Sequence, residues 1–203
     1  MKLHYSPASP YVRKVMAAAV ETGLDERIEL IPTNVRDPDP ELVRHNPLSK
    51  VPALITDGGE NLFDSPVICE YLDSLHDGPK LFPLPGAARW RALRLQALGD
   101  GVLDAAVLCR MEGFRPAERR SAEFVAQQKG KVASALDALE QEAGGFGDAV
   151  TIGAITVGCA LGYLDFRFSE DDWRAGRPAL AAWYAEFAKR PSMVRSAPRE
   201  PTV

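Results

Sequence analysis

The chain contains 203 residues, of which 46% are apolar, 26% charged and 8% aromatic. This composition excludes a disordered chain, because it supplies enough apolar side chains for a sizeable core. No apolar run approaches the roughly 18 residues that cross a bilayer, and the N-terminal residues lack the apolar core of a secretory signal. The net charge of −4 argues against general nucleic-acid binding, which needs positive charge to neutralise phosphates.

The cysteines and histidines are widely spaced, and none of them has the spacing of a metal-binding motif. We therefore expect no metal site and no disulfide framework. Cys69, Cys109 and Cys159 lie in apolar helical contexts and are expected to be inert, buried thiols. Such cysteine usage is typical of a reducing compartment, so a cytoplasmic location is expected, with no nucleic-acid or membrane partner.

Strand and helix patterns alternate in the first part of the chain. Strand patterns cover residues 2–6, 28–31, 52–56 and 60–63, the last two joined by a hairpin signal at 57–59. Helical spacing of apolar residues covers 10–22 and 65–76, and a short helix is expected over 41–45. The order β-α-β-α-β-β-α is that of a thioredoxin-like α/β domain, which we place at residues 1–77.

Residues 78–86 are rich in proline and glycine, which remove backbone donors and favour turns, so they are interpreted as a linker. Beyond them no strand alternation is found. Helical patterns cover 87–112, 117–143, 151–168 and 178–190, so residues 87–203 are predicted to form an all-α helical bundle.

Ser9-Pro10 is a strong helix start, because serine is a preferred N-cap and proline fits the first helical turn. Ser9 can therefore be a cap only. It also follows a strand and precedes a helix N-terminus, which favours an anion. The run Ser9-Pro10-Tyr11-Val12 resembles the Cys-Pro-Tyr-Cys of a glutaredoxin without its sulfurs. A hydroxyl there does no disulfide exchange, but it can donate a hydrogen bond to a thiolate.

Two further motifs lie at element boundaries. Val51-Pro52 directly precedes a strand; in a thioredoxin-like domain this position favours a cis proline, with the backbone of Val51 turned toward an extended thiol peptide. Asp64-Ser65 precedes Pro66 at a helix start, so one of the pair is expected to cap the helix. A carboxylate beside a hydroxyl and helix N–H groups is also complementary to the head group of an α-amino acid: the carboxylate can pair with its ammonium, and the hydroxyl and N–H groups can receive its carboxylate.

Three segments in this order resemble a bacterial cytosolic glutathione transferase with a serine at the thiol-activating position. They are residues 9–14 (SPYVRK), 46–54 (NPLSKVPAL) and 64–72 (DSPVICEYL), and the resemblance covers the whole chain. It implies that Ser9 stabilises the glutathione thiolate and that the backbone at Val51-Pro52 binds the cysteinyl unit. It further implies that Asp64-Ser65 holds the γ-glutamyl end and that Lys50 meets the glycyl carboxylate.

The resemblance implies an enzyme that adds the thiolate of glutathione, its co-substrate, to a hydrophobic electrophile, as in detoxification. The helical domain would contribute the second-substrate site, for which Tyr11, Leu108, Met111 and Phe114 are the candidates. A homodimer is expected, from the family and from the apolar and arginine-rich face of residues 87–112, although this face can also be merely exposed.

Three alternatives stay open at this point. The same scaffold suits a glutathione-dependent isomerase or dehalogenase, in which the thiolate adds and leaves again. It also suits a non-catalytic binding protein, against which the retained Ser9, Lys50 and Asp64-Ser65 argue. A disulfide oxidoreductase is disfavoured, because no cysteine stands at the start of the first helix.

Two positions depart from the family pattern. Asp64 replaces a frequent glutamate, which keeps the charge but shortens its reach. Thr151-Ile152-Gly153-Ala154 keeps the capping threonine of a buried helix and loses the acid three residues later, so half of the reciprocal capping box is missing.

Overall fold

The computed structural model describes residues 1–34 and 40–201. The chain divides into two compact units, one made of Met1–Leu84 with Pro191–Val203 and the other of Pro85–Arg190. Within the described residues, no helix is long and apolar enough to cross a membrane.

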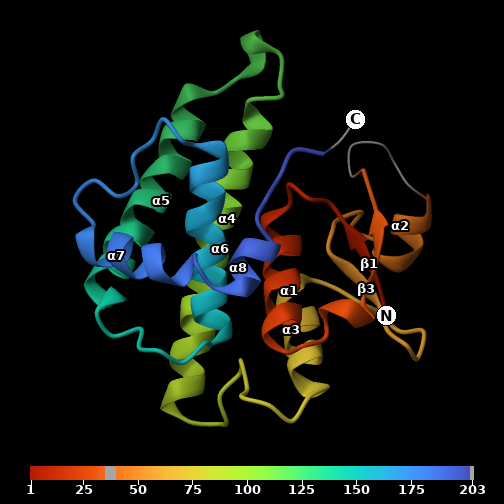
Figure 1. The fold of residues 1–203 in the computed structure, drawn as a ribbon. Helices are drawn as coiled ribbons and strands as arrows, with labels where there is room; N and C mark the ends of the chain where they lie inside the picture. Colours follow the sequence, from red (N-terminus) through yellow and green to blue (C-terminus); the bar gives the residue numbers. More distant parts are fainter. Residues whose placement is uncertain (35–39, 202–203) are drawn as a thin grey trace. The chain divides into compact units, whose positions relative to one another are not determined.

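The N-terminal unit is built on a four-stranded mixed sheet in the order β2-β1-β3-β4 (Figure 1). Strand β1 (Lys2–Tyr5) runs parallel to β2 (Glu29–Pro32) and antiparallel to β3 (Ala53–Ile55), and β3 pairs antiparallel with β4 (Asn61–Leu62). Leu3 lies between Leu30 and Leu54 in register and is fully buried, so the sheet's centre is also the core of this unit.

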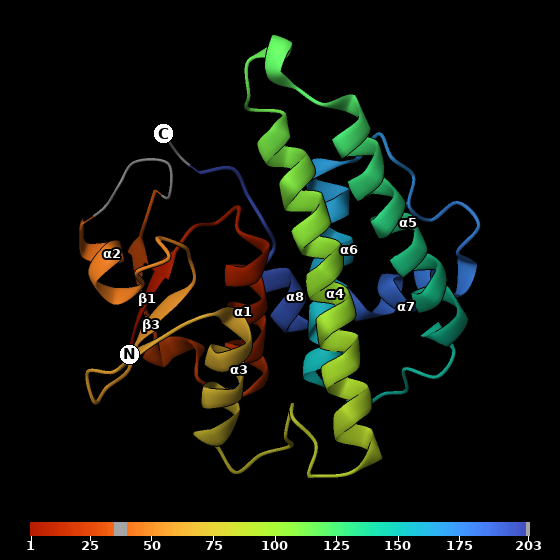
Figure 2. The same cartoon turned by 180° about the vertical axis from the view of Figure 1, so that it is seen from behind.

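Three helices cover the two faces of this sheet. Helices α1 (Pro10–Glu21) and α3 (Ser65–Ser74) pack together on one face, and α2 (Pro40–His45) lies on the other, as Figures 1 and 2 both show. The short 3-10 helix η1 (Asp25–Arg27) precedes β2. The thioredoxin-like order predicted from the sequence is therefore confirmed, with element ends within about two residues of those expected.

The C-terminal segment joins the N-terminal unit. Helix α8 (Pro191–Arg195) packs on α1, where the Arg13 guanidinium donates to the carbonyl of Met193 at 3.3 Å and the Ser192 hydroxyl donates to Glu21. The sequence placed residues 191–203 with the helical domain, because a short helix gives no local sign of the partner on which it packs.

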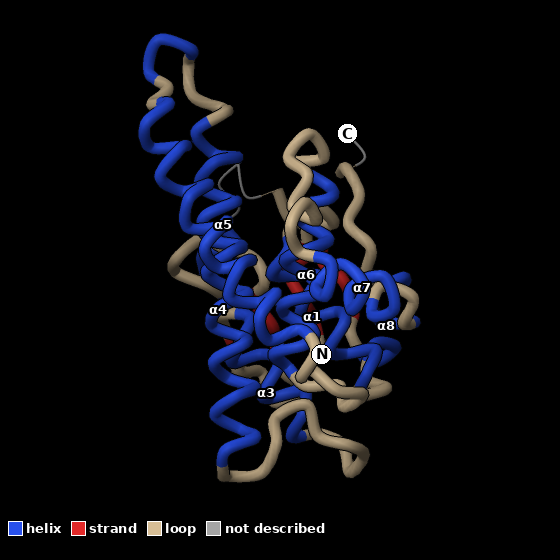
Figure 3. The backbone as a smooth tube through the Cα atoms, turned by 90° about the vertical axis from the view of Figure 1, so that its left-hand side faces the viewer, coloured by secondary structure: helices blue, strands red, loops and turns tan. Residues whose placement is uncertain are grey.

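The second unit is all-helical, with α4 (Ala87–Glu112), α5 (Ala122–Ala143), α6 (Ile152–Arg167), α7 (Pro178–Phe187) and the 3-10 helix η2 (Ala117–Arg119). Figure 3 shows how helix dominates here. Helix α6 is buried from residue 152 to 164 and packs against α4. The approach is close because Gly153 faces α4: a Cβ there would lie 2.6 Å from the Ala92 carbonyl oxygen.

Helix α5 begins at residue 122 and not at 117 as the sequence suggested. Ser121 is its N-cap and accepts from the Phe124 N–H at 3.1 Å, while its own N–H donates to Glu112 at 2.8 Å. This carboxylate from the end of α4 thus fixes where α5 starts. A contact between two helices cannot be read from local helical spacing.

The cysteines form no disulfide in the described part of the chain, and the histidines contact nearby side chains. All three cysteines are buried. His4 Nε2 lies 2.9 Å from His45 Nδ1, and His76 Nε2 lies 3.1 Å from the Asp73 carboxylate. Among the described residues no group of three or more histidine, cysteine or acidic side chains is placed to hold a metal ion.

Candidate active site at the sheet edge

The sheet topology brings the three sequence motifs to one edge. Strand β1 ends at Tyr5, β3 begins with Ala53 opposite His4, and β4 ends with Leu62 opposite Leu54. Because β3 runs antiparallel to both neighbours, the chain leaves β1 and β4 at the edge where it enters β3. Three segments therefore meet at this edge: the one from β1 to Ser9, the one from Val51 into β3, and the one from β4 to Asp64.

Ser9 is the N-cap of α1, as predicted, and is half-buried. Its hydroxyl oxygen accepts a hydrogen bond from the Val12 N–H at 3.3 Å, and its carbonyl accepts from the Arg13 N–H at 3.0 Å. Within the described residues, the Ser9 hydroxyl proton has no acceptor. The hydroxyl is thus available to donate to a ligand while it caps the helix.

A buried asparagine shapes the loop that enters β3. The Asn46 side-chain amide donates to the Lys50 carbonyl at 2.8 Å, and its oxygen accepts from the Leu48 N–H at 3.0 Å. Within this loop Ser49 has a φ of 53°, in the left-handed region. The loop presents an exposed Lys50 side chain and a half-buried Val51, and the Val51–Pro52 peptide bond is cis, as the sequence predicts.

Asn46 is the site residue that the sequence reasoning quoted but gave no role. Its side chain bonds backbone groups two and four residues ahead, which is typical of asparagine in turns. The signal was therefore present as an Asn-Pro pair after a short helix.

Asp64 occupies the N-cap position of α3, but its side chain makes no capping hydrogen bond, which corrects the expectation that one of Asp64 and Ser65 would cap. The first-turn bond is made instead by its carbonyl, which accepts from the Ile68 N–H at 3.1 Å. The Phe63–Asp64 peptide bond is cis. Asp64 is exposed and has no ion-pair partner in the described part of the chain, whereas Ser65 is buried.

The edge therefore offers groups of opposite character. The Ser9 hydroxyl and the start of α1 favour an anion, and the start of α3 beside Ser65 favours another. Asp64 favours a cation and Lys50 a further anion. Such a set can bind an extended zwitterionic peptide.

The residues predicted for a second substrate belong to both units. Leu108, Met111 and Phe114 are exposed at the end of α4 and beyond it, with the Arg110 guanidinium 4.6 Å from the centre of the Phe114 ring. Tyr11 is half-buried on α1, in the other unit.

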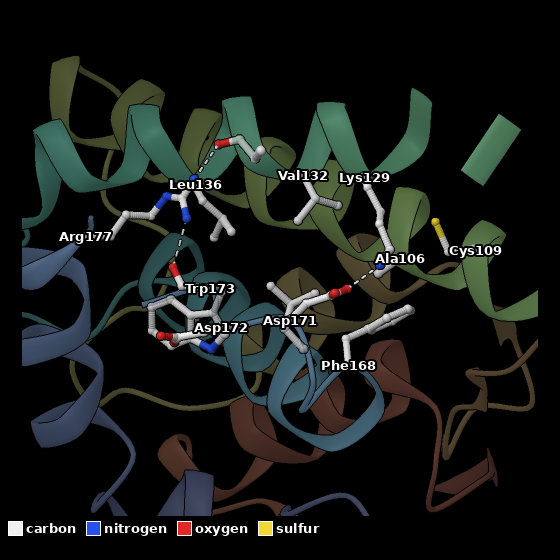
Figure 4. A pocket seen from close by; sticks show the side chains of 12 residues that line it. Ala106, Cys109, Lys129, Val132, Leu136, Phe168, Asp171, Asp172, Trp173 and Arg177 are labelled. Atoms are coloured by element: carbon white, nitrogen blue, oxygen red, sulfur yellow. Dashed lines mark hydrogen bonds and ion pairs between the residues drawn. The ribbon is translucent and has the colours of Figure 1, made fainter. Parts of the chain in front are cut away.

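A cavity of about 200 Å³ inside the helical unit uses different residues (Figure 4). Its walls come from α4, α5, α6 and the segment after α6, and Lys129 and Asp171 form an ion pair at 2.6 Å across it. Burial raises the pKa of the Cys109 thiol in its wall, an effect that nearby Lys129 opposes. None of the four predicted second-substrate residues lines it.

The fold and the edge site are those of a thioredoxin-like domain joined to a helical one. Residues 8–75 match the glutathione S-transferase N-terminal domain, and residues 122–186 match the glutathione S-transferase C-terminal domain. The chain is 35% identical over 206 residues to the GST-like protein YibF of Escherichia coli K12, itself described as uncharacterized, with 98% of both chains covered. The chain belongs to the glutathione S-transferase family.

Two solved structures are similar over almost the whole chain. A glutathione transferase family member from Pseudomonas fluorescens Pf-5, with bound glutathione, has a TM-score of 0.94 and 46% identity, with 99% of each chain covered. A glutathione S-transferase from Methylobacillus flagellatus KT, with glutathione bound, has a TM-score of 0.91 and 39% identity, with 98% of this chain and 99% of the other covered.

Proposed function

We propose that this chain binds reduced glutathione at the edge formed by Ser9, Val51 and Asp64, stabilises its thiolate and adds it to a hydrophobic electrophile. The observation that carries the proposal is the set of groups at one sheet edge. They are the Ser9 hydroxyl, whose proton has no acceptor among the described residues, the backbone of Val51 before β3, and the Asp64 carboxylate, which has no ion-pair partner among them. The glutathione in the two related structures supports this ligand class.

Each end of the tripeptide has a matching group. The Asp64 carboxylate pairs with the γ-glutamyl ammonium, while the Ser65 hydroxyl and the N–H groups at the start of α3 receive the α-carboxylate. The backbone of Val51 next to Pro52 bonds the cysteinyl unit as an added strand would. Lys50, exposed and without an ion-pair partner in the described residues, meets the glycyl carboxylate.

Ser9 has the catalytic role, because it donates its hydroxyl proton to the thiolate. A thiol with a pKa of about 8.5 is only a few per cent ionised at neutral pH. Lowering that pKa to about 6.5 makes the thiol mostly ionised and requires about 2.7 kcal/mol of differential stabilisation. One charge-assisted hydrogen bond contributes about half of this, and the start of α1 contributes much of the rest.

The electrophile is held by apolar side chains. Leu108, Met111 and Phe114 form an exposed apolar stretch on the helical unit, and Tyr11 follows the catalytic serine by two residues. Contact with these side chains selects a hydrophobic second substrate by burying its apolar surface.

The chain acts as a homodimer in this proposal, and exposed apolar side chains on each unit support it. Leu84 is 82% exposed and Trp90 is 70% exposed. The arginines of α4 are less suitable than expected, because Arg91 donates to the Gly145 carbonyl at 2.7 Å and Arg94 pairs with Glu142. Analytical ultracentrifugation at micromolar concentration should find twice the 22.1 kDa chain mass, and a monomer would contradict the dimer.

Calorimetric titration followed by turnover tests the function. Reduced glutathione should give saturable heat with a dissociation constant between about micromolar and millimolar. Conjugation of an aromatic chloride or a Michael acceptor should then exceed isomerisation and dehalogenation of matched substrates. If glutathione does not bind, the proposal is overturned. If glutathione binds but the protein only isomerises its substrates, the proposed ligand stands and the proposed conjugation reaction is wrong.

A further inference from the structure

The N-terminal unit contains a second cavity, of about 150 Å³. It lies between the β1–α1 connection and the segment after α8, which are joined by a hydrogen bond from the Arg199 N–H to the Pro7 carbonyl at 3.2 Å. Among the described residues, its polar walls comprise three arginines, two serines and one tyrosine, and no acidic side chain: Tyr5, Ser6, Arg13, Arg195, Ser196 and Arg199.

Arg13 is the unusual member of this wall. Its side chain comes from the first turn of α1, and the residue is only 7% exposed. One terminal nitrogen, Nη2, donates to the Met193 carbonyl at 3.3 Å, but Nε and Nη1 are buried without an acceptor among the described residues. Buried N–H groups of a charged side chain rarely lack partners, because the loss of hydration is then uncompensated.

The other two arginines, Arg195 and Arg199, differ in whether a carboxylate balances their charge. Arg195 is paired with Asp25, so its charge is largely balanced. Arg199 is exposed and has no ion pair within the described part of the chain. The cavity therefore carries a positive charge on Arg13 and another on Arg199, with hydroxyl groups of Ser6 and Ser196 beside them.

We propose that this cavity binds a small oxyanion, a phosphate or carboxylate group that accepts hydrogen bonds from Arg13 and pairs with Arg199. Oxyanions carry only acceptors and bind guanidinium groups through charge-assisted hydrogen bonds. The apolar wall of Val12, Met16 and Leu30 lowers the local dielectric and strengthens these bonds.

The proposed oxyanion site and the proposed glutathione site share the β1–α1 connection, since Ser9 lies between the cavity residues Pro7 and Val12, but they extend to opposite sides of β1. Leu30 belongs to β2, whereas Val51 precedes β3 and Asp64 follows β4. In the strand order β2-β1-β3-β4 these strands lie on opposite sides of β1. The oxyanion is therefore proposed to bind on the β2 side of β1, and the experiment below asks whether it does so while the glutathione site is occupied.

Arginine side-chain NMR tests the proposal directly. Inorganic phosphate is titrated into the full chain at constant ionic strength, with sodium chloride as the blank, and the ¹H–¹⁵N signal of Arg13 Nε is followed. The expected result is a saturable shift of this signal that persists when S-methylglutathione occupies the other site. A parallel titration with malonate distinguishes a phosphoryl from a carboxylate ligand, and either one supports the site.

Variants separate the site from general charge effects. Arg199→Gln keeps Arg13 and the fold and should weaken binding of the probe about tenfold, the effect of one lost charged partner. Arg119→Gln, an exposed arginine in the helical unit, is the matched control and should bind as the wild type does. No shift with either anion, equal binding by both variants, or loss of the shift on adding S-methylglutathione would overturn the proposal.

Discussion

The Ser9 hydroxyl oxygen accepts a hydrogen bond from the Val12 N–H at 3.3 Å, so capping uses a lone pair of the oxygen and leaves its proton unused. The two possible roles of Ser9 are therefore compatible in one geometry. The cap holds the hydroxyl at the start of α1, and the proton is directed by whichever acceptor a ligand brings. The mechanism proposed for this chain depends on that second role.

Asp64→Ala should weaken glutathione binding by about 2 kcal/mol, roughly thirtyfold, because the ligand ammonium loses its charged partner. Glu60→Ala is the matched control, since Glu60 is an exposed carboxylate at the other end of β4. Calorimetry on both variants checks this. Equal affinities for the two variants would show that Asp64 does not hold the γ-glutamyl end.

Asn46→Ala should lower the free energy of unfolding by about 1–3 kcal/mol, because the Leu48 N–H and the Lys50 carbonyl lose their partner. It should also weaken glutathione binding, since Lys50 and Val51 depend on this loop. Asn46→Asp keeps the acceptor for Leu48 and places a carboxylate against the Lys50 carbonyl. If calorimetry finds wild-type affinity in both variants, the loop is not part of the site.

Gly153→Ala should destabilise the helical unit by roughly 1–3 kcal/mol through overpacking, because the new Cβ would lie 2.7 Å from that of Leu95. Gly101→Ala is the matched control on α4, where a Cβ meets nothing within 4 Å. Gly101→Ala should instead raise the free energy of unfolding by up to about 1 kcal/mol, because alanine has a higher helix propensity than glycine. Urea unfolding that gives both variants the same sign would refute the close packing of α6 on α4.

Glu112 should make stability depend on pH in the acid range. The Ser121 N–H, and then the Arg115 guanidinium, hold the pKa of the Glu112 carboxyl below its ordinary value. A lowered folded-state pKa gives stability that is present above the unfolded value of about 4.3 and is lost as the pH falls through the folded value.

The thermal midpoint of Glu112→Gln should therefore lie below that of the wild type at pH 7, and the difference should shrink as the pH falls below about 4. Glu118→Gln, an exposed glutamate on η2, should track the wild type throughout. A constant difference for Glu112→Gln at every pH would contradict the role of its charge.

The parts of the fold that depend on local pattern could be predicted from the sequence. Alternation and helical spacing located every strand and long helix, and the capping role of Ser9 was readable from Ser-Pro after a strand. The start of α5 was placed five residues early, because it depends on Glu112 from another helix. The packing of α8 on α1 could not be read either, since Arg13 and Met193 are far apart in the sequence.

In the candidate site, too, features set by local sequence could be predicted and features set by tertiary structure could not. The motifs around Ser9, Val51 and Asp64 were visible because each marks an element boundary. The missing side-chain cap at Asp64 depends on the backbone path into α3, and the oxyanion cavity depends on a C-terminal segment that meets the β1–α1 connection. Both arise from tertiary structure and leave no local pattern.

Two substitutions at Ser9 separate capping from donation. Ser9→Ala removes both and should cost about 1 kcal/mol of stability, while glutathione affinity stays within a few fold. Ser9→Asp keeps a good N-cap but brings a negative charge and no proton at neutral pH. If turnover depends on the donated proton, both variants should lose about 10- to 100-fold in rate although only the first loses the cap.

The most direct test is the ultraviolet titration of the glutathione thiolate bound to the wild type and to Ser9→Ala. In the wild type the bound thiol should ionise well below its ordinary pKa of about 8.5. In Ser9→Ala the midpoint should rise by about one unit or more, the effect of one charge-assisted hydrogen bond. Identical titration curves for the two proteins would contradict the proposed mechanism and leave Ser9 as a helix cap only.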